Sequence, residues 1–347
     1  MIPIKNIYYM LSYAFHILNK QGYKKFAAES FDNTAELCAA ILACGITYQI
    51  KRGLGKEYIL QTETLSTLRG KIDFSESNRT LTFHRRQMVC SYDEFSVNSY
   101  MNQIIKTTML FLLHADIAKE RKKELRKLLV FFDEVDVIDV HSINWNLQYN
   151  RSNQTYRMLI FICYLVIKGL IQTHNLGGVK LMDFLDEQRM SRLYEKFILE
   201  YYRKEHPQIS AKSSQISWQL DDDVSSMLPV MQTDIMLTYK EKTLIIDAKY
   251  YSHTTQIQYN KATLYSSHLY QIFTYVKNKE VELRDCPHEV SGMLLYAKTD
   301  EDIYPENVYS MSGNRIEVRM LDLDCDFSMI RSQLDGIVEK YFGIALT

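Results

Sequence analysis

Three charged residues stand at the ends of two neighbouring apolar segments in the C-terminal half of the chain. Asp234 precedes the first segment, and the second one ends with Asp247 and Lys249. The polar tetrad Tyr239–Lys242 between them has the length of a hairpin connection. A hairpin centred on this tetrad sets Asp234 opposite Asp247, and strand alternation puts Asp247 and Lys249 on one face. We therefore expect both carboxylates to converge on one point, with the lysine beside them.

Such a cluster has the chemistry of a divalent-metal site. Two adjacent carboxylates repel each other unless a cation lies between them, and Mg²⁺ prefers carboxylate, carbonyl and water oxygens. We expect Asp234 and Asp247 to bind Mg²⁺, with Mn²⁺ as the alternative cation and the carbonyl oxygen of Ala248 as a third ligand. Lys249 would orient or deprotonate an attacking water, or neutralise a pentavalent phosphorane. Metal-assisted in-line attack on a phosphodiester needs these groups.

The same residues also have a purely structural interpretation. Leu244–Ile246 is wholly apolar, so Asp247 and Lys249 stand where a buried strand emerges. A structural Asp–Lys pair is common at such a position. Asp234 at hairpin spacing favours the catalytic interpretation.

Two predicted helices supply further polar groups. Glu195 lies in the helix expected at 187–205, offset from its apolar stripe, and is a candidate acidic metal ligand, direct or through water. The alternative is a solvated helix charge. Gln271 and Tyr275 are four residues apart in the helix expected at 263–279 and therefore share a face. They are candidates for contacting the lysine or the DNA backbone, and the alternative is packing.

The elements around these residues predict two domains, which also suits a length of 347 residues. For the C-terminal half, the sequence predicts the order helix, three strands, helix, strands and helix. This order is typical of an α/β sheet domain. The N-terminal half reads as helices around a small antiparallel sheet or barrel, with strands at 57–64, 68–74 and 80–89. The helical pattern breaks near 174–187. We expect an N-terminal mixed α+β domain and a C-terminal α/β domain, with the bounds 1–178 and 179–347.

The net charge of the chain argues against strong binding of nucleic acid by this chain alone. The formal net charge is −1, so no global basic field attracts nucleic acid. This weighs against a protein that coats DNA, whose affinity would come from phosphate neutralisation. It leaves room for an enzyme that a partner delivers to DNA. The basic stretches at 84–86 and 119–127 read as solvated surface.

The cysteines and the N-terminus exclude other classes. None of the six cysteines has C-x-x-C spacing, which argues against a zinc or redox motif. The start of the chain lacks the pattern of a signal peptide. The most apolar stretch, 158–171, carries Lys168 and is too short to span a bilayer. We expect a cytoplasmic protein with no membrane association.

In this order, the candidate residues resemble the PD-(D/E)xK nuclease superfamily and its RecB-like branch with a helical Gln-x-x-x-Tyr. The matching residues are Glu195, Asp234, Asp247-Ala-Lys249 and Gln271-Ile-Phe-Thr-Tyr275. One departure is that Thr233 precedes Asp234, so the literal Pro-Asp pair is missing. The resemblance implies a restriction-endonuclease-like fold, with Asp234, Asp247, Lys249, Glu195 and Gln271 as catalytic residues.

A narrower resemblance covers nearly the whole chain. The segments 2–14, 68–74, 193–197 and 233–251 together look like McrC, the nuclease subunit of McrBC-type restriction systems. This resemblance implies an AAA+ GTPase hexamer of McrB type as partner, bound through the N-terminal domain, which enters the ring and stimulates GTP hydrolysis. Arg69 and Lys71 are candidate contacts to the ring. The substrate implied is double-stranded DNA of invading phage. No P-loop motif occurs in this chain.

Two rival functions stay open. A stand-alone RecB-like repair nuclease would cut DNA without a partner, and would need an exposed basic channel that the net charge does not supply. A catalytically silent activator of the partner GTPase would have no use for the intact set of Asp234, Asp247 and Lys249.

Overall fold

The protein forms two compact units. The computed structural model describes residues 2–15, 29, 31, 33–150, 153–175, 187–222, 224–250, 256–258, 261–298 and 305–344. The sheet unit consists of Met1–Ser30 with Met182–Thr347, and the helical unit consists of Phe31–Leu181. Within the described ranges, none of the helices is long and apolar enough to cross a membrane.

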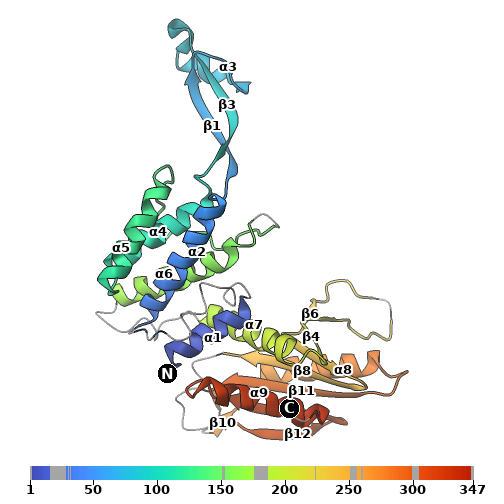
Figure 1. The fold of residues 1–347 in the computed structure, drawn as a ribbon. Coiled ribbons are helices and arrows are strands. Elements are labelled where there is room, and N and C mark those ends of the chain that lie inside the picture. Colours follow the sequence, from blue (N-terminus) through green and yellow to red (C-terminus); the bar gives the residue numbers. More distant parts are fainter. Residues whose placement is uncertain are drawn as a thin grey trace. The chain divides into compact units, whose positions relative to one another are not determined.

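A six-stranded mixed sheet forms the centre of the sheet unit, in the order β12-β13-β11-β8-β7-β4 (Figure 1). β8, β11 and β13 run parallel, and the remaining neighbours pair antiparallel. The strands are β4 Ser210–Lys212, β7 Ile235–Tyr239, β8 Lys242–Lys249, β11 Glu289–Ala297, β12 Asn307–Met311 and β13 Asn314–Leu321. The central strands are almost wholly apolar because both faces of the sheet are covered.

A tight hairpin joins β7 to β8. Its turn contains Lys240 at a φ of 54°, in the left-handed region. The register pairs Tyr239 with Lys242 and Ile235 with Ile246. One step further along the same register, Asp234 faces Asp247. The observed hairpin thus has the register that the sequence spacing predicts.

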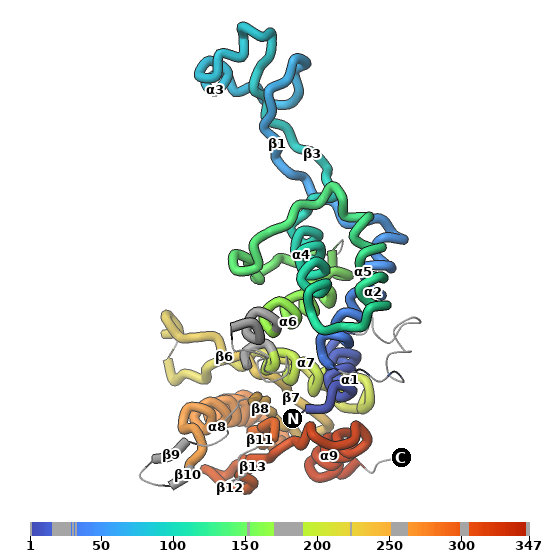
Figure 2. Tube along the Cα trace, turned by 90° about the vertical axis from the view of Figure 1, so that its left-hand side faces the viewer, coloured from blue at the N-terminus to red at the C-terminus, as the bar shows by residue number. Residues whose placement is uncertain are grey.

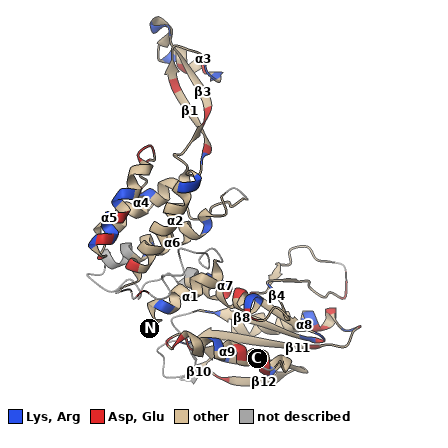
Figure 3. Ribbon diagram, viewed as in Figure 1, with Lys and Arg blue, Asp and Glu red and all other residues tan. Residues whose placement is uncertain are grey.

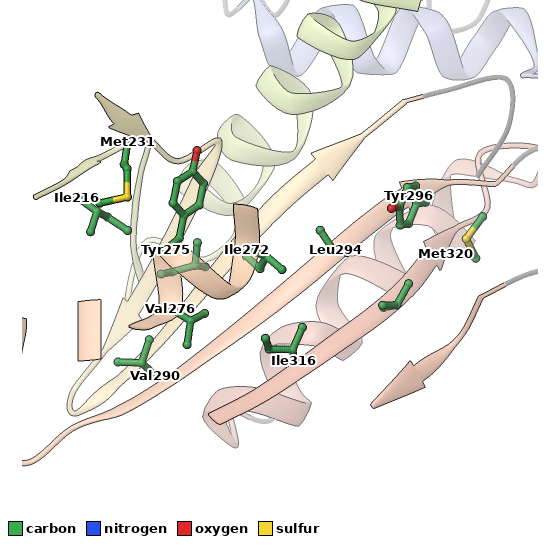
Figure 4. Close-up of a cluster of buried hydrophobic side chains, with 12 residues drawn as sticks. Ile216, Met231, Ile272, Tyr275, Val276, Val290, Leu294, Tyr296, Ile316 and Met320 are labelled. Atoms are coloured by element: carbon green, nitrogen blue, oxygen red, sulfur yellow. The ribbon is translucent and has the colours of Figure 1, made fainter. Parts of the chain in front are cut away.

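Helix α8, Ser266–Glu282, covers one face of the sheet. Its Ile272 and Val276 join Ile245 of β8 and Leu294 of β11 in a buried cluster (Figure 4). Alternate residues of β8 point to the other face, where helices α7, Glu187–Glu205, and α9, Phe327–Phe342, pack. α8 therefore packs on the sheet face to which the odd-numbered residues of β8 point. These residues include Asp247 and Lys249.

The first helix, α1 Ile4–Ala14, belongs to the sheet unit. It packs on α7, and its Tyr13 hydroxyl donates a 2.7 Å hydrogen bond to Glu205. The Asn6 amide donates to the carbonyl of Leu323 at 2.9 Å. The expected domain 1–178 assigned this helix to the N-terminal half and is wrong in that respect, because local periodicity does not reveal which surface covers the apolar face of a helix. Residue 178 itself lies outside the described ranges.

In its described residues, the helical unit contains four packed helices and a long antiparallel ribbon (Figures 1 and 2). The helices are α2 Thr34–Arg52, α4 Tyr100–His114, α5 Lys119–Leu129 and α6 Tyr156–Asn175. The ribbon is formed by β1 Glu57–Leu65 and β3 Met88–Ser96, with β2 Lys71–Ile72 on the other edge of β3. Helix α3, Phe74–Arg79, lies at its far end.

The far end of the ribbon differs from the sequence prediction. The strand expected at 68–74 is reduced to β2, and the strand expected at 80–89 is a turn and a 3-10 helix that lead into β3. Asp73 starts α3 because its side chain accepts a 2.9 Å hydrogen bond from the backbone N–H of Glu76. Gly70 has a φ of +69°, and a Cβ there would lie 2.4 Å from the carbonyl oxygen of Ser91. These local contacts outweigh the strand propensity of the segment.

Candidate active site

The β7–β8 hairpin brings two acidic side chains together. Asp234 precedes β7, and its Oδ2 accepts a 2.9 Å hydrogen bond from the backbone N–H of Ala248. Asp247 lies opposite, on β8, and is only 1% exposed. The charge of Asp234 contributes to raising the pKa of Asp247, as expected for neighbouring carboxyl groups. The two carboxyl groups therefore meet at the end of the hairpin.

The Asp247 carboxylate is buried, with the Lys249 ammonium as its cationic partner. Among the described residues, neither of its oxygens accepts a well-formed hydrogen bond. The ammonium of Lys249 lies 2.9 Å from Oδ2 and forms an ion pair with it. Burial raises the pKa of Asp247, the lysine lowers it and Asp234 raises it, and the net direction is upward. A buried carboxylate this poorly satisfied costs folding free energy, which a bound cation would offset.

The oxygen donors at this point suit a hard divalent cation. Within an extended strand, the N–H and C=O of one residue face the same neighbour, so the Ala248 carbonyl faces the Asp234 side. In the described part of the chain, no group of three or more His, Cys, Asp or Glu is arranged to hold a metal ion. The candidate ligands are therefore two carboxylates, one carbonyl and water, and Mg²⁺ commonly binds through one or two carboxylates while keeping several waters.

Glu195 of α7 lies near this pair but is not grouped with it as a third direct ligand. Its Oε1 accepts a 2.9 Å hydrogen bond from the Ser191 hydroxyl. Burial raises the pKa of Glu195 to about 7, and the charge of Asp234 adds to this rise. Glu195 is thus close enough to Asp234 for its pKa to respond to the charge of that carboxylate.

Helix α8 provides a second contact to the Lys249 ammonium, in addition to Asp247. The Lys249 ammonium donates to Gln271 Oε1 at 3.2 Å. Gln271 Nε2 donates to the Tyr275 hydroxyl at 3.0 Å, and that hydroxyl donates to the carbonyl of Gln232 at 3.1 Å. Helical spacing puts Gln271 and Tyr275 on one face, while Ile272 and its neighbours anchor the helix. The lysine is therefore held between a carboxylate and an amide.

Three further polar residues lie around the cluster and were not predicted as site residues. Ser191 bonds Glu195, as described above. His268 Nδ1 lies 2.8 Å from the Tyr296 hydroxyl, and Tyr296 pairs with Lys249 in the β8–β11 register. The one available signal was that His268 precedes Gln271 by three residues on the same helix. Tyr296 could not be found from the sequence, because its place depends on a strand register across a crossover.

The two residues predicted to contact a partner lie in the helical unit. Arg69 and Lys71 are both exposed, and the Arg69 guanidinium lies 3.9 Å from the centre of the Tyr92 ring. Exposed apolar residues flank them in the sequence, including Leu68 at 58% and Phe74 at 60% exposure. In Figure 3 the ribbon near α3 carries the colour of Lys and Arg positions.

Comparison with known proteins identifies the family. The family model described as "McrBC 5-methylcytosine restriction system component" matches residues 5–297. The Type IV methyl-directed restriction enzyme EcoKMcrBC of Escherichia coli (strain K12) is 27% identical over 346 residues, 98% of each chain. A half-complex from the tetradecameric assembly of Thermococcus gammatolerans McrB AAA+ hexamers with bound McrC is 17% identical, with a TM-score of 0.47 over 96% of this chain and 76% of that one. The T. gammatolerans McrBC complex is 20% identical, with a TM-score of 0.42 over 58% of each chain. Since the family model spans most of the sequence, the chain belongs to the McrBC 5-methylcytosine restriction system component family.

Proposed function

We propose that this chain is the DNA endonuclease subunit of an McrBC-type restriction system, and that the sheet unit is a PD-(D/E)xK nuclease domain. The observation that carries the proposal is the buried Asp247 carboxylate beside Asp234 and Lys249. Among the described residues, its oxygens accept no well-formed hydrogen bond, and the Lys249 ammonium forms an ion pair with it. Membership of the restriction-system family supports DNA as the substrate. The reaction is hydrolysis of a phosphodiester.

Asp234, Asp247 and the Ala248 carbonyl would hold the cation, with Glu195 contributing through water. When bound, Mg²⁺ or Mn²⁺ would supply Lewis-acid polarisation of the phosphodiester. The fit rests on the chemistry of the oxygen donors and on the unsatisfied oxygens of Asp247.

Lys249 is the side chain that would bring a positive charge to the phosphate. Held between Asp247 at 2.9 Å and Gln271 at 3.2 Å, its ammonium is fixed before the substrate arrives. A preorganised charge stabilises the negative charge that develops on the phosphate during in-line attack, and costs no reorganisation during the reaction. Gln271 is itself fixed by Tyr275, so its role is to orient the lysine.

The helical unit would dock an AAA+ GTPase hexamer of McrB type. The segment between β1 and β3, at the far end of the ribbon, exposes Leu68, Phe74 and Leu81 at 58%, 60% and 62%. The same segment carries the cationic Arg69 and Lys71. Apolar and arginine side chains together are typical of protein interfaces. With a formal net charge of −1, the chain would depend on its partner to hold and move the DNA.

The decisive experiment is Asp247→Ala in the full chain, assayed with the partner ring, GTP, Mg²⁺ and methylcytosine-containing plasmid DNA. Cleavage should be abolished, while partner binding and stimulation of GTP hydrolysis should remain. Asp285→Ala is the matched control, because Asp285 is an exposed acidic residue of the same unit.

Three outcomes would contradict the proposal. Cleavage by Asp247→Ala would remove this site from the reaction. Full cleavage by the wild-type chain without the ring would favour a stand-alone repair nuclease. Stimulation of GTP hydrolysis by a wild-type chain that never cuts would favour a catalytically silent activator.

A further inference from the structure

A histidine–tyrosine pair lies on the flank of the candidate lysine. His268 Nδ1 is 2.8 Å from the Tyr296 hydroxyl, and the ring centroids are 5.9 Å apart. Tyr296 pairs with Lys249 in the parallel β8–β11 register. Paired residues of neighbouring strands project from the same face, so the tyrosine ring stands next to the lysine side chain.

Both members of the pair are fixed in place. Tyr296 is fully buried and belongs to the apolar cluster beneath α8 (Figure 4). His268 is in the first turn of α8, three residues before Gln271, and its ring also lies 5.1 Å from the Tyr265 ring. One helix therefore contacts the lysine directly through Gln271 and contacts the lysine's strand neighbour through His268.

The protonation state of His268 suits a place beside an ammonium. Burial lowers the pKa of His268 to about 4, and the charge of Lys249 adds to this effect. The imidazole is therefore neutral near pH 7. A neutral ring hydrogen-bonds the tyrosine without repelling the lysine.

We propose that His268 is a positioning residue of this site, which acts through the Tyr296 hydroxyl to keep Lys249 in its productive position. The inference rests on the proposed nuclease function. Gln271 holds the end of the lysine side chain, and the Tyr296 ring, locked at its hydroxyl by His268, limits the sideways movement of that side chain.

Two isosteric substitutions separate this role from direct contact with DNA. Asn places an amide where the Nδ1 of histidine lies, and can donate or accept toward Tyr296, whereas Gln places its amide near the Nε2 position. We expect His268→Asn to cut DNA almost like the wild type. His268→Gln and His268→Ala should lower kcat about fivefold to tenfold, the worth of one hydrogen bond, with little change in KM.

Tyr296→Phe provides the second measurement, since it removes a single oxygen and keeps the buried ring. It should lower kcat as much as His268→Ala does, and the double variant should be no slower than either single one, because both remove the same hydrogen bond. Each variant is assayed in the full chain with the partner ring, GTP, Mg²⁺ and plasmid DNA. Unfolding temperature and GTPase stimulation are measured alongside, so that loss of folded protein is recognised.

The inference is overturned if His268→Gln retains activity while His268→Asn loses it, because the imidazole would then contact substrate through Nε2. It is also overturned if His268→Ala and Tyr296→Phe cut at the wild-type rate, or if their effects add. Asp247→Ala separates this failure from failure of the proposed function. Loss of cleavage in Asp247→Ala together with a fully active His268→Ala contradicts only the positioning role.

Discussion

The end of the β7–β8 hairpin and the far end of the β1–β3 ribbon are both rich in potential binding groups, but they offer opposite surfaces. At the hairpin, Asp247 is buried and poorly satisfied, and each neighbouring polar group has a defined partner. At the ribbon, large apolar side chains such as Phe74 and Leu81 are exposed on a narrow element. The first surface suits a small, highly charged ligand, whereas the second suits another protein.

The two surfaces belong to different units and differ in chemistry, so a substitution can damage one function without the other. A change at the hairpin should affect cleavage and metal binding and leave partner binding intact. A change at the ribbon should affect partner binding and leave metal binding intact.

The largest effect is expected from Asp247→Asn. Cleavage should fall by at least about a thousandfold, since a charged ligand is lost. In EDTA the same variant should be more stable than the wild type by on the order of 1–3 kcal/mol near pH 8. The pKa of Asp247 is raised by burial, so the folded state disfavours the charged form that the amide replaces.

Addition of Mg²⁺ sharpens this test. It should raise the unfolding temperature of the wild type and leave that of Asp247→Asn unchanged, because only a site that binds the ion gains stability from it. Asp285→Asn is the exposed control. Equal Mg²⁺ stabilisation of wild type and Asp247→Asn would place the cation elsewhere.

An intermediate effect is expected from Phe74→Asp at the ribbon. An apolar anchor replaced by a charge should weaken binding of the partner ring by about thirtyfold, equivalent to about 2 kcal/mol. Stability should change by less than about 0.5 kcal/mol, because Phe74 is 60% exposed. Binding is measured by titration of the ring, with stimulation of GTP hydrolysis as the second readout.

Val308→Asp is the matched control for the ribbon, since Val308 is an apolar residue of the sheet unit with 52% exposure. Loss of ring binding in Val308→Asp, or full binding in Phe74→Asp, would contradict the assignment of the ribbon as the docking surface.

The smallest effect is expected from Glu195→Gln, read as the pH dependence of stability in EDTA. The pKa of Glu195 is raised from 4.5 to about 7, chiefly by burial, so the folded state binds more protons than the unfolded state between these values. The free energy of unfolding contributed by this group is fully present below pH 4.5 and is lost as the pH rises to about 7. Glu195→Gln should therefore show a shallower decline over this window in urea titrations. Glu306→Gln, at an exposed position, should keep the wild-type slope, and an unchanged slope in Glu195→Gln would refute the shift.

The sequence predicted the register of the hairpin better than contacts between residues far apart in the chain. The four-residue connection was enough to predict the register that sets Asp234 opposite Asp247, because a hairpin fixes both strands at once. The helical spacing of Gln271 and Tyr275 predicted a face that contacts the lysine or the DNA backbone, and the hydrogen bond from Lys249 to Gln271 is present. Tyr296 was missed, because its place beside Lys249 depends on strands joined through α8, which no local pattern encodes.

At the far end of the ribbon, the local secondary structure itself was predicted wrongly. The strand β1 was predicted, whereas β3 was expected eight residues too early and α3 was not expected at all. The alternation within 80–89 resembles a strand, but the cap at Asp73 and the left-handed backbone at Leu81 and Arg86 turn the chain instead. Such irregular segments are decided by single side-chain contacts rather than by periodicity.

The place of α1 in the sheet unit has a consequence for how the protein is made. The helix leaves the ribosome before the whole helical unit, yet α7 and the residues near Leu323, which it packs against and bonds, are synthesised much later. During translation, the apolar side of α1 therefore stays uncovered until these later residues are synthesised. The side chains concerned include Ile7, Met10 and Leu11, which are buried in the folded protein. A fragment that starts at residue 182 would lack this helix and would leave the aromatic surface around Tyr201 uncovered, a state prone to aggregation.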